Sequence, residues 1–248
     1  MKQLLKNGFI IALISLFLMS CNDDDGYSLG KYWITTGTVN LTDDYFYVTT
    51  DSGDDLWPSA SNVSSKNLED GMRVFVNYTI LGDVTDGSYD YYVKINSLTE
   101  ILTKPIFNFT EETTEEVKDS IGNDAVSITD TWFTDDYLNV QFEYGGGSRV
   151  HYINLVKDTE DLETEDGAII LELKHNKNDD PYNYLQWSVA SFDISELQVP
   201  GQTSVDVFVR ALDKAGEYQY NKVLTYEYLV KTPVSKSFKT EDISGLVK

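Results

Sequence analysis

Short runs in which apolar and polar residues alternate recur along the chain, and this two-residue period constrains the fold more than any other feature. Residues 73–81, 89–98 and 138–144 each place most of their apolar side chains in alternate positions. A strand with one buried face requires this alternation, whereas an amphipathic helix needs a period near 3.6 residues. The pattern therefore predicts an all-β fold.

The first half of the chain, residues 32–103, is predicted to form a small closed barrel. Runs rich in β-branched and aromatic residues are separated there by turn groups of Gly and Asp. Such runs and groups are typical of strands and tight turns. About five strands in about 75 residues fit an OB-like β-barrel, the class of oligonucleotide- and oligosaccharide-binding domains.

The second half, residues 121–233, is predicted to form an antiparallel β-sandwich of the Ig-like type, because short strands recur there without a sustained helical period. The clearest expected strands span residues 138–144, 150–156, 169–175, 185–189, 205–209 and 223–230. Residues 104–120 are largely acidic and polar, which predicts a linker between the domains. Residues 234–248 are expected to be a polar tail.

The first 20 residues have the composition of an export signal. Two lysines precede an apolar run at residues 10–19, which is shorter than the roughly 20 residues of a membrane-spanning helix. Leu18, Ser20 and Cys21 then fit a bacterial lipobox. We therefore predict a signal peptide over residues 1–20 and acylation of Cys21. The alternative is a plain secretory signal beside an incidental cysteine.

Acylation of Cys21 would tie the chain to a lipid bilayer, since two or more acyl chains hold stably. Residues 21–31 would then be a lipidated tether. The expected location is the cell envelope, anchored to the outer membrane and facing the periplasm or the cell surface. The acids at residues 23–25 fit either the export tag of surface lipoproteins of Bacteroidetes or a merely solvated tether.

The charge balance excludes one class of partner. The chain has 41 Asp and Glu against 19 Lys and Arg, a net charge of −22. Affinity for nucleic acid comes mainly from Lys and Arg that neutralise phosphates, so nucleic-acid binding is not expected. Cys21 is the only cysteine, so no intramolecular disulfide can form and stability must come from packed cores.

The sequence contains few residues that could support catalysis or bind a metal ion. His151 and His175 are the only histidines, and both alternate in phase with apolar neighbours. We interpret them as core residues with hydrogen bonds, for example to a turn carbonyl near Asn178 or Asp180. No catalytic residue, cofactor or metal is predicted. Paired carboxylates of a glycosidase stay open as an alternative because acids are so numerous.

Four aromatic residues of the first half are the candidate ligand-binding group. Trp33, Tyr45, Tyr47 and Trp57 fall in the first two expected strands and the loop that follows. OB-type barrels bind extended ligands on this part of the fold, and aromatic rings stack on sugar rings. The alternative is that these side chains fill the small core or the interface between the domains.

The chain resembles the NigD-like lipoproteins of Bacteroidetes over nearly all of its mature length. Five residues carry the more specific part of the resemblance: His175, Asn176, Ser191, Phe192 and Asp193. Residues 71–74 carry most of the likeness in the barrel half. The resemblance implies an OB-type barrel, a β-sandwich, an envelope location and an association with bacteriocin-related gene clusters. Residues 119–121 also resemble the tripeptide that carries O-glycans in Bacteroides-type bacteria, which would place a glycan on Ser120.

Two functions of different classes follow. The first is a non-enzymatic surface lipoprotein that binds a protein, peptide or glycan ligand, with an association to bacteriocins. The second is an envelope hydrolase or glycan-processing enzyme that works through carboxylates. Scarce histidine and the absence of a nucleophile-elbow motif favour the binding protein.

Overall fold

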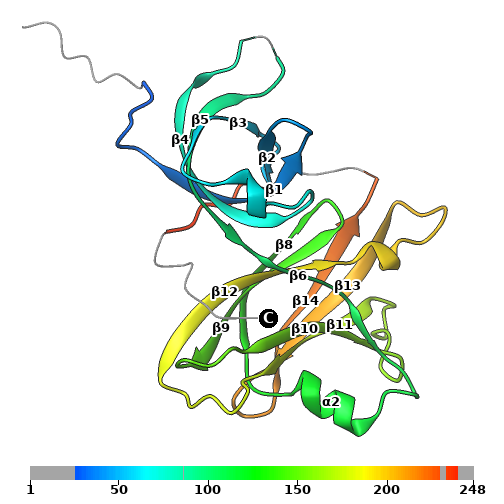
Figure 1. Ribbon diagram of the computed structural model, residues 1–248. Helices are drawn as coiled ribbons and strands as arrows, with labels where there is room; N and C mark the ends of the chain where they lie inside the picture. The colour runs from blue at the N-terminus through cyan, green and yellow to red at the C-terminus, as the bar shows by residue number, and fades with distance from the viewer. Residues whose placement is uncertain (1–25, 86, 230–232, 240–248) are drawn as a thin grey trace, which may run out of the picture.

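A five-stranded barrel sits on one end of a two-sheet sandwich (Figure 1). This computed structural model describes residues 26–85, 87–229 and 233–239, so the signal segment and Cys21 lie outside the described residues. Within those ranges, no helix is long and apolar enough to cross a membrane. The prediction of an all-β fold, with an OB-like barrel followed by a sandwich, is confirmed.

The barrel closes in the strand order β1-β2-β3-β5-β4, with β4 pairing back to β1. Its elements are β1 (Trp33–Leu41), β2 (Phe46–Thr50), β3 (Asp55–Ser61), the 3-10 turn η2 (Ser65–Asn67), β4 (Arg73–Asp83) and β5 (Tyr91–Glu100). Alternate residues of each strand point inward, as the two-residue period predicts. The fully enclosed core residues are Val39, Val48, Leu56, Val74, Val76, Val93 and Ile95.

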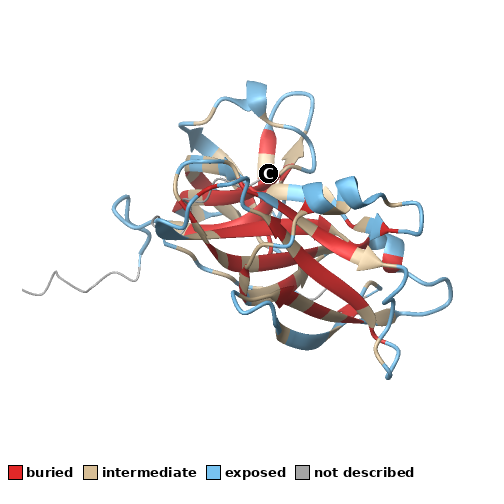
Figure 2. Ribbon diagram, turned by 90° about the horizontal axis from the view of Figure 1, so that it is seen from below, coloured by how far each residue is buried: buried red, intermediate tan, exposed pale blue. Residues whose placement is uncertain are grey.

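The sandwich packs a five-stranded sheet, β14-β13-β11-β10-β7, on a four-stranded sheet, β6-β12-β9-β8. The strands are β6 (Leu102–Pro105), β7 (Phe107–Phe109), β8 (Ser127–Thr134), β9 (Tyr137–Gly146), β10 (Tyr152–Asp158), β11 (Ile169–Asn176), β12 (Tyr184–Asp193), β13 (Ser204–Leu212) and β14 (Tyr218–Glu227). A 3-10 turn, η3 (Ser195–Leu197), follows β12. The buried residues lie mainly on the strands of the barrel and of the sandwich (Figure 2).

Residues 104–120 do not form the linker that their composition predicts. Strand β6 pairs parallel with β12, and β7 pairs parallel with β10. The acidic run enters the helix α2 (Glu115–Ile121), whose Ile121 is buried with Phe109 and Val156. The buried apolar residues of this cluster are too far apart in sequence to show a helical or strand period. The acidic residues form the solvent-exposed face of the helix. Because β11 also pairs parallel with β13, the sheets are mixed rather than purely antiparallel.

An apolar layer joins the barrel to the sandwich. Phe75 of β4 packs there with Trp132 of β8, and the ring of Phe238 lies 5.2 Å from that of Phe75. The backbone N–H of Phe238 donates to the carbonyl of Ile34 at 3.0 Å, and that of Val234 donates to the carbonyl of Asp51 at 2.7 Å. The described part of the expected polar tail, residues 234–239, therefore lies along the junction of the two domains.

A buried ion pair of the barrel lies at the same junction. Arg73 of β4 donates two hydrogen bonds to the carboxylate of Asp51, at 2.6 and 2.9 Å, and both side chains are 0% exposed. From the sandwich, the indole N–H of Trp132 donates to Asp51 at 3.1 Å, and Asn139 Oδ1 accepts from Arg73 at 3.0 Å. Polar groups of both domains thus bond to one another where water is excluded, and only the Nε of Arg73 is left without a partner among the groups named here.

Candidate functional site

Four rings on the outside of the barrel form a continuous surface, which we call the aromatic face: Tyr45, Tyr47, Trp57 and Tyr89. Phe46 and Val48 point into the core, so the alternation of β2 turns Tyr47 outward. Ring centroids lie 4.6 Å apart for Tyr45 and Trp57, 4.8 Å for Trp57 and Tyr89, and 5.3 Å for Tyr47 and Tyr89. These spacings are those of mutually packed aromatic side chains.

Local contacts, burial and nearby carboxylates raise the pKa values of Tyr89 and Tyr47 on the aromatic face. The hydroxyl of Tyr89 donates to that of Tyr45 at 3.2 Å, and this bond, together with burial and the charge of Asp55, raises the pKa of Tyr89 to about 12. Burial, followed by the charge of Asp55, also raises the pKa of Tyr47. Asp90 adjoins Tyr89 and accepts a hydrogen bond from the backbone of Asp55 at 2.7 Å. The surface therefore presents neutral rings within a negative field.

Trp33 does not join the other predicted ligand-binding residues. Its ring stacks on Tyr78, with centroids 6.0 Å apart, and packs against the barrel core. The ammonium of Lys31 lies 5.0 Å from the Trp33 ring centroid. The structure thus brings together Tyr45, Tyr47 and Trp57 and leaves Trp33 elsewhere.

Tyr89 is the member of the aromatic face that sequence reasoning missed. It lies in the loop before β5, and β3 pairs with β5 in parallel, so residues far apart in sequence meet on one surface. Strand alternation predicts which side a strand residue faces, but it does not predict where a loop residue packs. The only available signal was the density of tyrosine in residues 89–92.

The two histidines form a buried pair at the opposite end of the molecule. His151 Nδ1 and His175 Nε2 lie 2.7 Å apart, and their rings stack with centroids at 5.0 Å. His175 Nδ1 lies 2.8 Å from the carbonyl oxygen of Ala125, and His151 Nε2 lies 3.1 Å from Asp180 Oδ2. The expected turn carbonyl near Asn178 is therefore not the partner of His175. A carbonyl of the segment before β8 takes that place.

These contacts indicate where the ring protons of the histidine pair lie. A carbonyl oxygen only accepts, so His175 Nδ1 carries a proton and donates to Ala125. Burial lowers the pKa of His175 to about 4, so its ring is neutral near neutral pH and its Nε2 accepts from His151 Nδ1. Backbone donation from Gly147 is the largest of the causes that lower the pKa of Asp180 to about 2.

The remaining residues of the predicted family motif sit in structural positions. Ser191 is buried and donates to Asn139 Oδ1 at 2.6 Å, which extends the polar network of the domain junction. Phe192 is fully enclosed in the sandwich core, and Asp193 accepts from a backbone N–H of the next turn. Asn176 donates to the carbonyl of Ser120, which is exposed at the end of α2. In the described residues, no group of three or more His, Cys, Asp or Glu is arranged to hold a metal ion.

Two domain families match the chain in successive segments. Residues 36–101 match the NigD-like N-terminal OB domain, and residues 108–225 match the NigD-like C-terminal beta sandwich domain. The two matches correspond to the barrel and to nearly all of the sandwich. No curated protein matches the sequence.

Solved structures from Parabacteroides and Bacteroides species match most of the chain. A protein of Parabacteroides distasonis, named only provisionally as toxin-related, is 33% identical with a TM-score of 0.63, over 80% of this chain and 94% of its own. A protein of unknown function from Bacteroides vulgatus is 27% identical with a TM-score of 0.67, over 87% and 100%. A NigD-like immunity protein from Bacteroides caccae is 21% identical with a TM-score of 0.58, over 80% and 98%. The chain belongs to the NigD-like family, with its N-terminal OB domain and its C-terminal β-sandwich.

Proposed function

We propose that this NigD-like chain is a lipid-anchored envelope protein that binds a polypeptide carrying basic side chains, and that the aromatic face is the binding surface. One observation carries the proposal: four packed rings lie outside the barrel, on β2, on β3 and on the loops before β2 and β5, with Asp55 and Asp90 beside them. This is the surface on which OB-type barrels take extended ligands.

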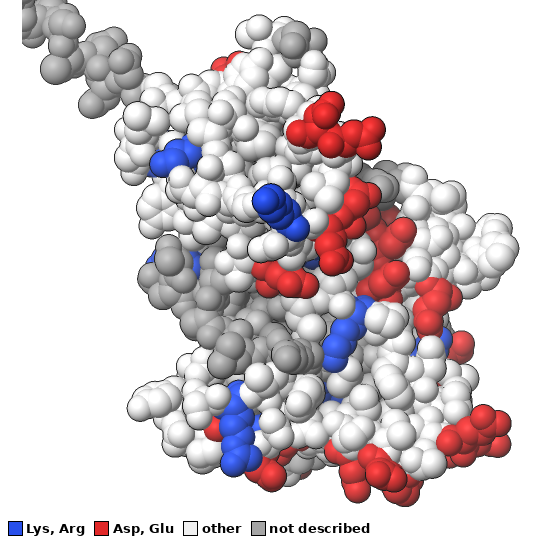
Figure 3. Space-filling model, viewed as in Figure 1, with Lys and Arg blue, Asp and Glu red and all other residues white. Residues whose placement is uncertain are grey.

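The chemistry of the aromatic face favours cationic groups. The faces of Trp and Tyr rings attract ammonium and guanidinium groups, and nearby carboxylates add to that attraction. The chain as a whole has a net charge of −22, and acidic side chains gather along one flank from the barrel to the sandwich (Figure 3). This field would steer a basic partner toward the protein and would repel an acidic one.

A polypeptide is the ligand class that fits the relatives best. One solved relative is named an immunity protein and another is named toxin-related. Both histidines of this chain are buried and are held by contacts with each other, with Asp180 and with the carbonyl of Ala125, although His175 also borders a pocket. The carboxylate-dependent hydrolase is therefore the weaker alternative.

Replacing Trp57 with alanine should weaken the binding of a basic peptide by about ten-fold or more, because central aromatic residues carry most of the energy of such surfaces. The measurement is a titration of the mature protein with a lysine- and arginine-rich peptide at low salt. The affinity should also fall as salt is added, since the attraction is partly electrostatic.

Tyr152→Ala is the control, because Tyr152 is an exposed aromatic residue of the sandwich that lies outside the aromatic face. It should leave the affinity unchanged. An acidic peptide of the same length should not bind. Binding of neutral oligosaccharides in place of the basic peptide would contradict the proposal. So would an equal loss of peptide affinity in Trp57→Ala and Tyr152→Ala.

Anchoring is tested separately. Cys21→Ala should move the protein from the membrane fraction to the soluble fraction of the envelope, because the acyl chains would be its only strong attachment to an anionic bilayer that its charge repels. Fractionation followed by mass spectrometry of the N-terminal peptide checks this. A wild-type peptide without acyl groups, or unchanged partitioning of the variant, would refute the lipid anchor.

A further inference from the structure

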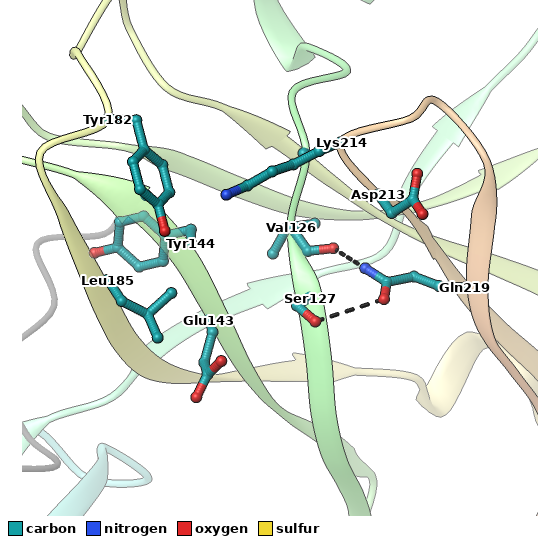
Figure 4. A pocket seen from close by; sticks show the side chains of 11 residues that line it. Val126, Ser127, Glu143, Tyr144, Tyr182, Leu185, Asp213, Lys214 and Gln219 are labelled. Atoms are coloured by element: carbon teal, nitrogen blue, oxygen red, sulfur yellow. Dashed lines mark hydrogen bonds between the residues drawn. The ribbon is translucent and has the colours of Figure 1, made fainter.

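A pocket of about 370 Å³ opens at the end of the sandwich away from the barrel (Figure 4). Its walls come from β9, from the start of β12 and from the turn between β13 and β14. A second pocket of about 360 Å³ lies beside it and shares the side chains of Tyr182 and Lys214. Volumes near the low end of the usual range fit a small ligand.

Tyr182 stands between the two pockets, and a glycine allows it to do so. A side chain at position 145 would begin 1.5 Å from the Tyr182 ring, so only Gly145 permits the ring to lie flat on β9. The ammonium of Lys214 lies over the other side, 3.8 Å from the ring centroid. Both faces of Tyr182 are thus covered, and a sugar ring could stack there only by displacing Lys214.

Lys214 is the basic group of the first pocket. It reaches from the β13–β14 turn toward Tyr182 (Figure 4) and makes no salt bridge with any residue that the structure describes. In a chain with 41 acidic residues, a lysine that faces a pocket without a carboxylate partner is available to a ligand carboxylate.

The rest of the pocket adds an acid and an apolar wall. Glu143 lines it from β9, whereas Asp213 is held by the backbone N–H groups of Ala215 and Glu217 within its own turn. The apolar wall includes Leu185, which is 62% exposed at the start of β12. At the pocket rim, Leu185 offers an apolar surface that an aliphatic group of a ligand could cover.

From this arrangement we propose that the pocket binds a small zwitterion with an apolar side chain, of the amino-acid or dipeptide class. The carboxylate of the ligand pairs with Lys214, its ammonium pairs with Glu143, and its side chain covers Leu185. A ligand with only one of the two charges leaves the other protein group unpaired. The site lies on the sandwich and is independent of the aromatic face of the barrel.

The experiment titrates the whole mature protein with L-leucine and with leucyl-leucine, followed by calorimetry or ligand-observed NMR. At least one of the two should bind, and the comparison between them identifies the length of the ligand. N-acetyl-leucine, which lacks the ammonium, and leucinamide, which lacks the carboxylate, should each bind about ten-fold more weakly or worse. Glucose should not bind.

Lys214→Gln and Glu143→Gln should each weaken leucine or leucyl-leucine binding by about ten-fold or more. Lys222→Gln is the matched control, because Lys222 also lies over a tyrosine ring, at 4.5 Å from Tyr220, but outside the pocket. It should change nothing, and circular dichroism should show all three variants folded. The proposal would be overturned if neither probe bound, or if N-acetyl-leucine and leucinamide bound as tightly as the probes. It would also be overturned if Lys214→Gln and Glu143→Gln both kept the wild-type affinity. None of these results bears on basic-peptide binding at Trp57.

Discussion

Replacing Asp51 with alanine should lower the free energy of unfolding by about 3–5 kcal/mol, because removal of one partner leaves a buried charge without compensation. The buried guanidinium of Arg73 would lose its counter-ion and keep only neutral acceptors such as Asn139, and the indole N–H of Trp132 would lose its acceptor. Burial alone would raise the pKa of Asp51, but hydrogen bonds from Arg73, Thr36 and Trp132 hold it below its ordinary value. The carboxylate is therefore charged in the folded protein.

The measurement is denaturant unfolding followed by tryptophan fluorescence, since Trp132 reports on the junction itself. Glu115→Ala is the control, because Glu115 pairs with Lys118 on an exposed helix surface and should contribute about 1 kcal/mol or less. Adding Arg73→Met to Asp51→Ala should restore part of the loss, since the unpaired charge is removed. A loss below about 1 kcal/mol in Asp51→Ala would show that the pair is not essential to the junction.

The burial of Arg73 could not be predicted from the sequence. The alternation of residues 73–81 correctly puts Arg73 on the face of β4 that points away from the barrel core. An outward side chain of a single domain is normally solvated, but here the sandwich covers that face and Arg73 is fully buried. Phe75, an apolar residue at another outward position of the same strand, is the one local signal of a covering domain.

The strands were predictable because the two-residue period is a local property, and most of them lie where it places them. The sandwich elements β6, β7 and α2 were not predicted, because each is held by a few apolar residues that contact distant strands. The same limit applies to the site. Three of the four predicted rings meet on the barrel, but Tyr89 joins them only through the fold, and Lys214 faces its pocket from a turn that carries no motif.

Acid should destabilise the folded protein in a window set by His175. The pKa of His175 is lowered from an ordinary 6.5 to about 4 in the folded state, chiefly by burial. Between those values the unfolded chain binds more protons than the folded one, so stability falls as the pH falls from about 6.5 to about 4. A shift of this size corresponds to about 3 kcal/mol at most. Asp180, whose pKa is lowered from 3.8 to about 2, adds a separate loss of stability as the pH falls below about 3.8.

The test compares the pH dependence of unfolding in the wild type and in His175→Gln. The variant should be less stable at pH 7, because His151 loses a ring partner and the carbonyl of Ala125 loses its donor. Its stability should nevertheless fall less steeply between pH 6.5 and 4, since the titrating group is gone. The many carboxylates titrate in both proteins, so the difference between the two curves isolates the histidine. Parallel curves for the two proteins would mean that the fold does not lower the pKa of His175, and burial would then not keep its ring neutral.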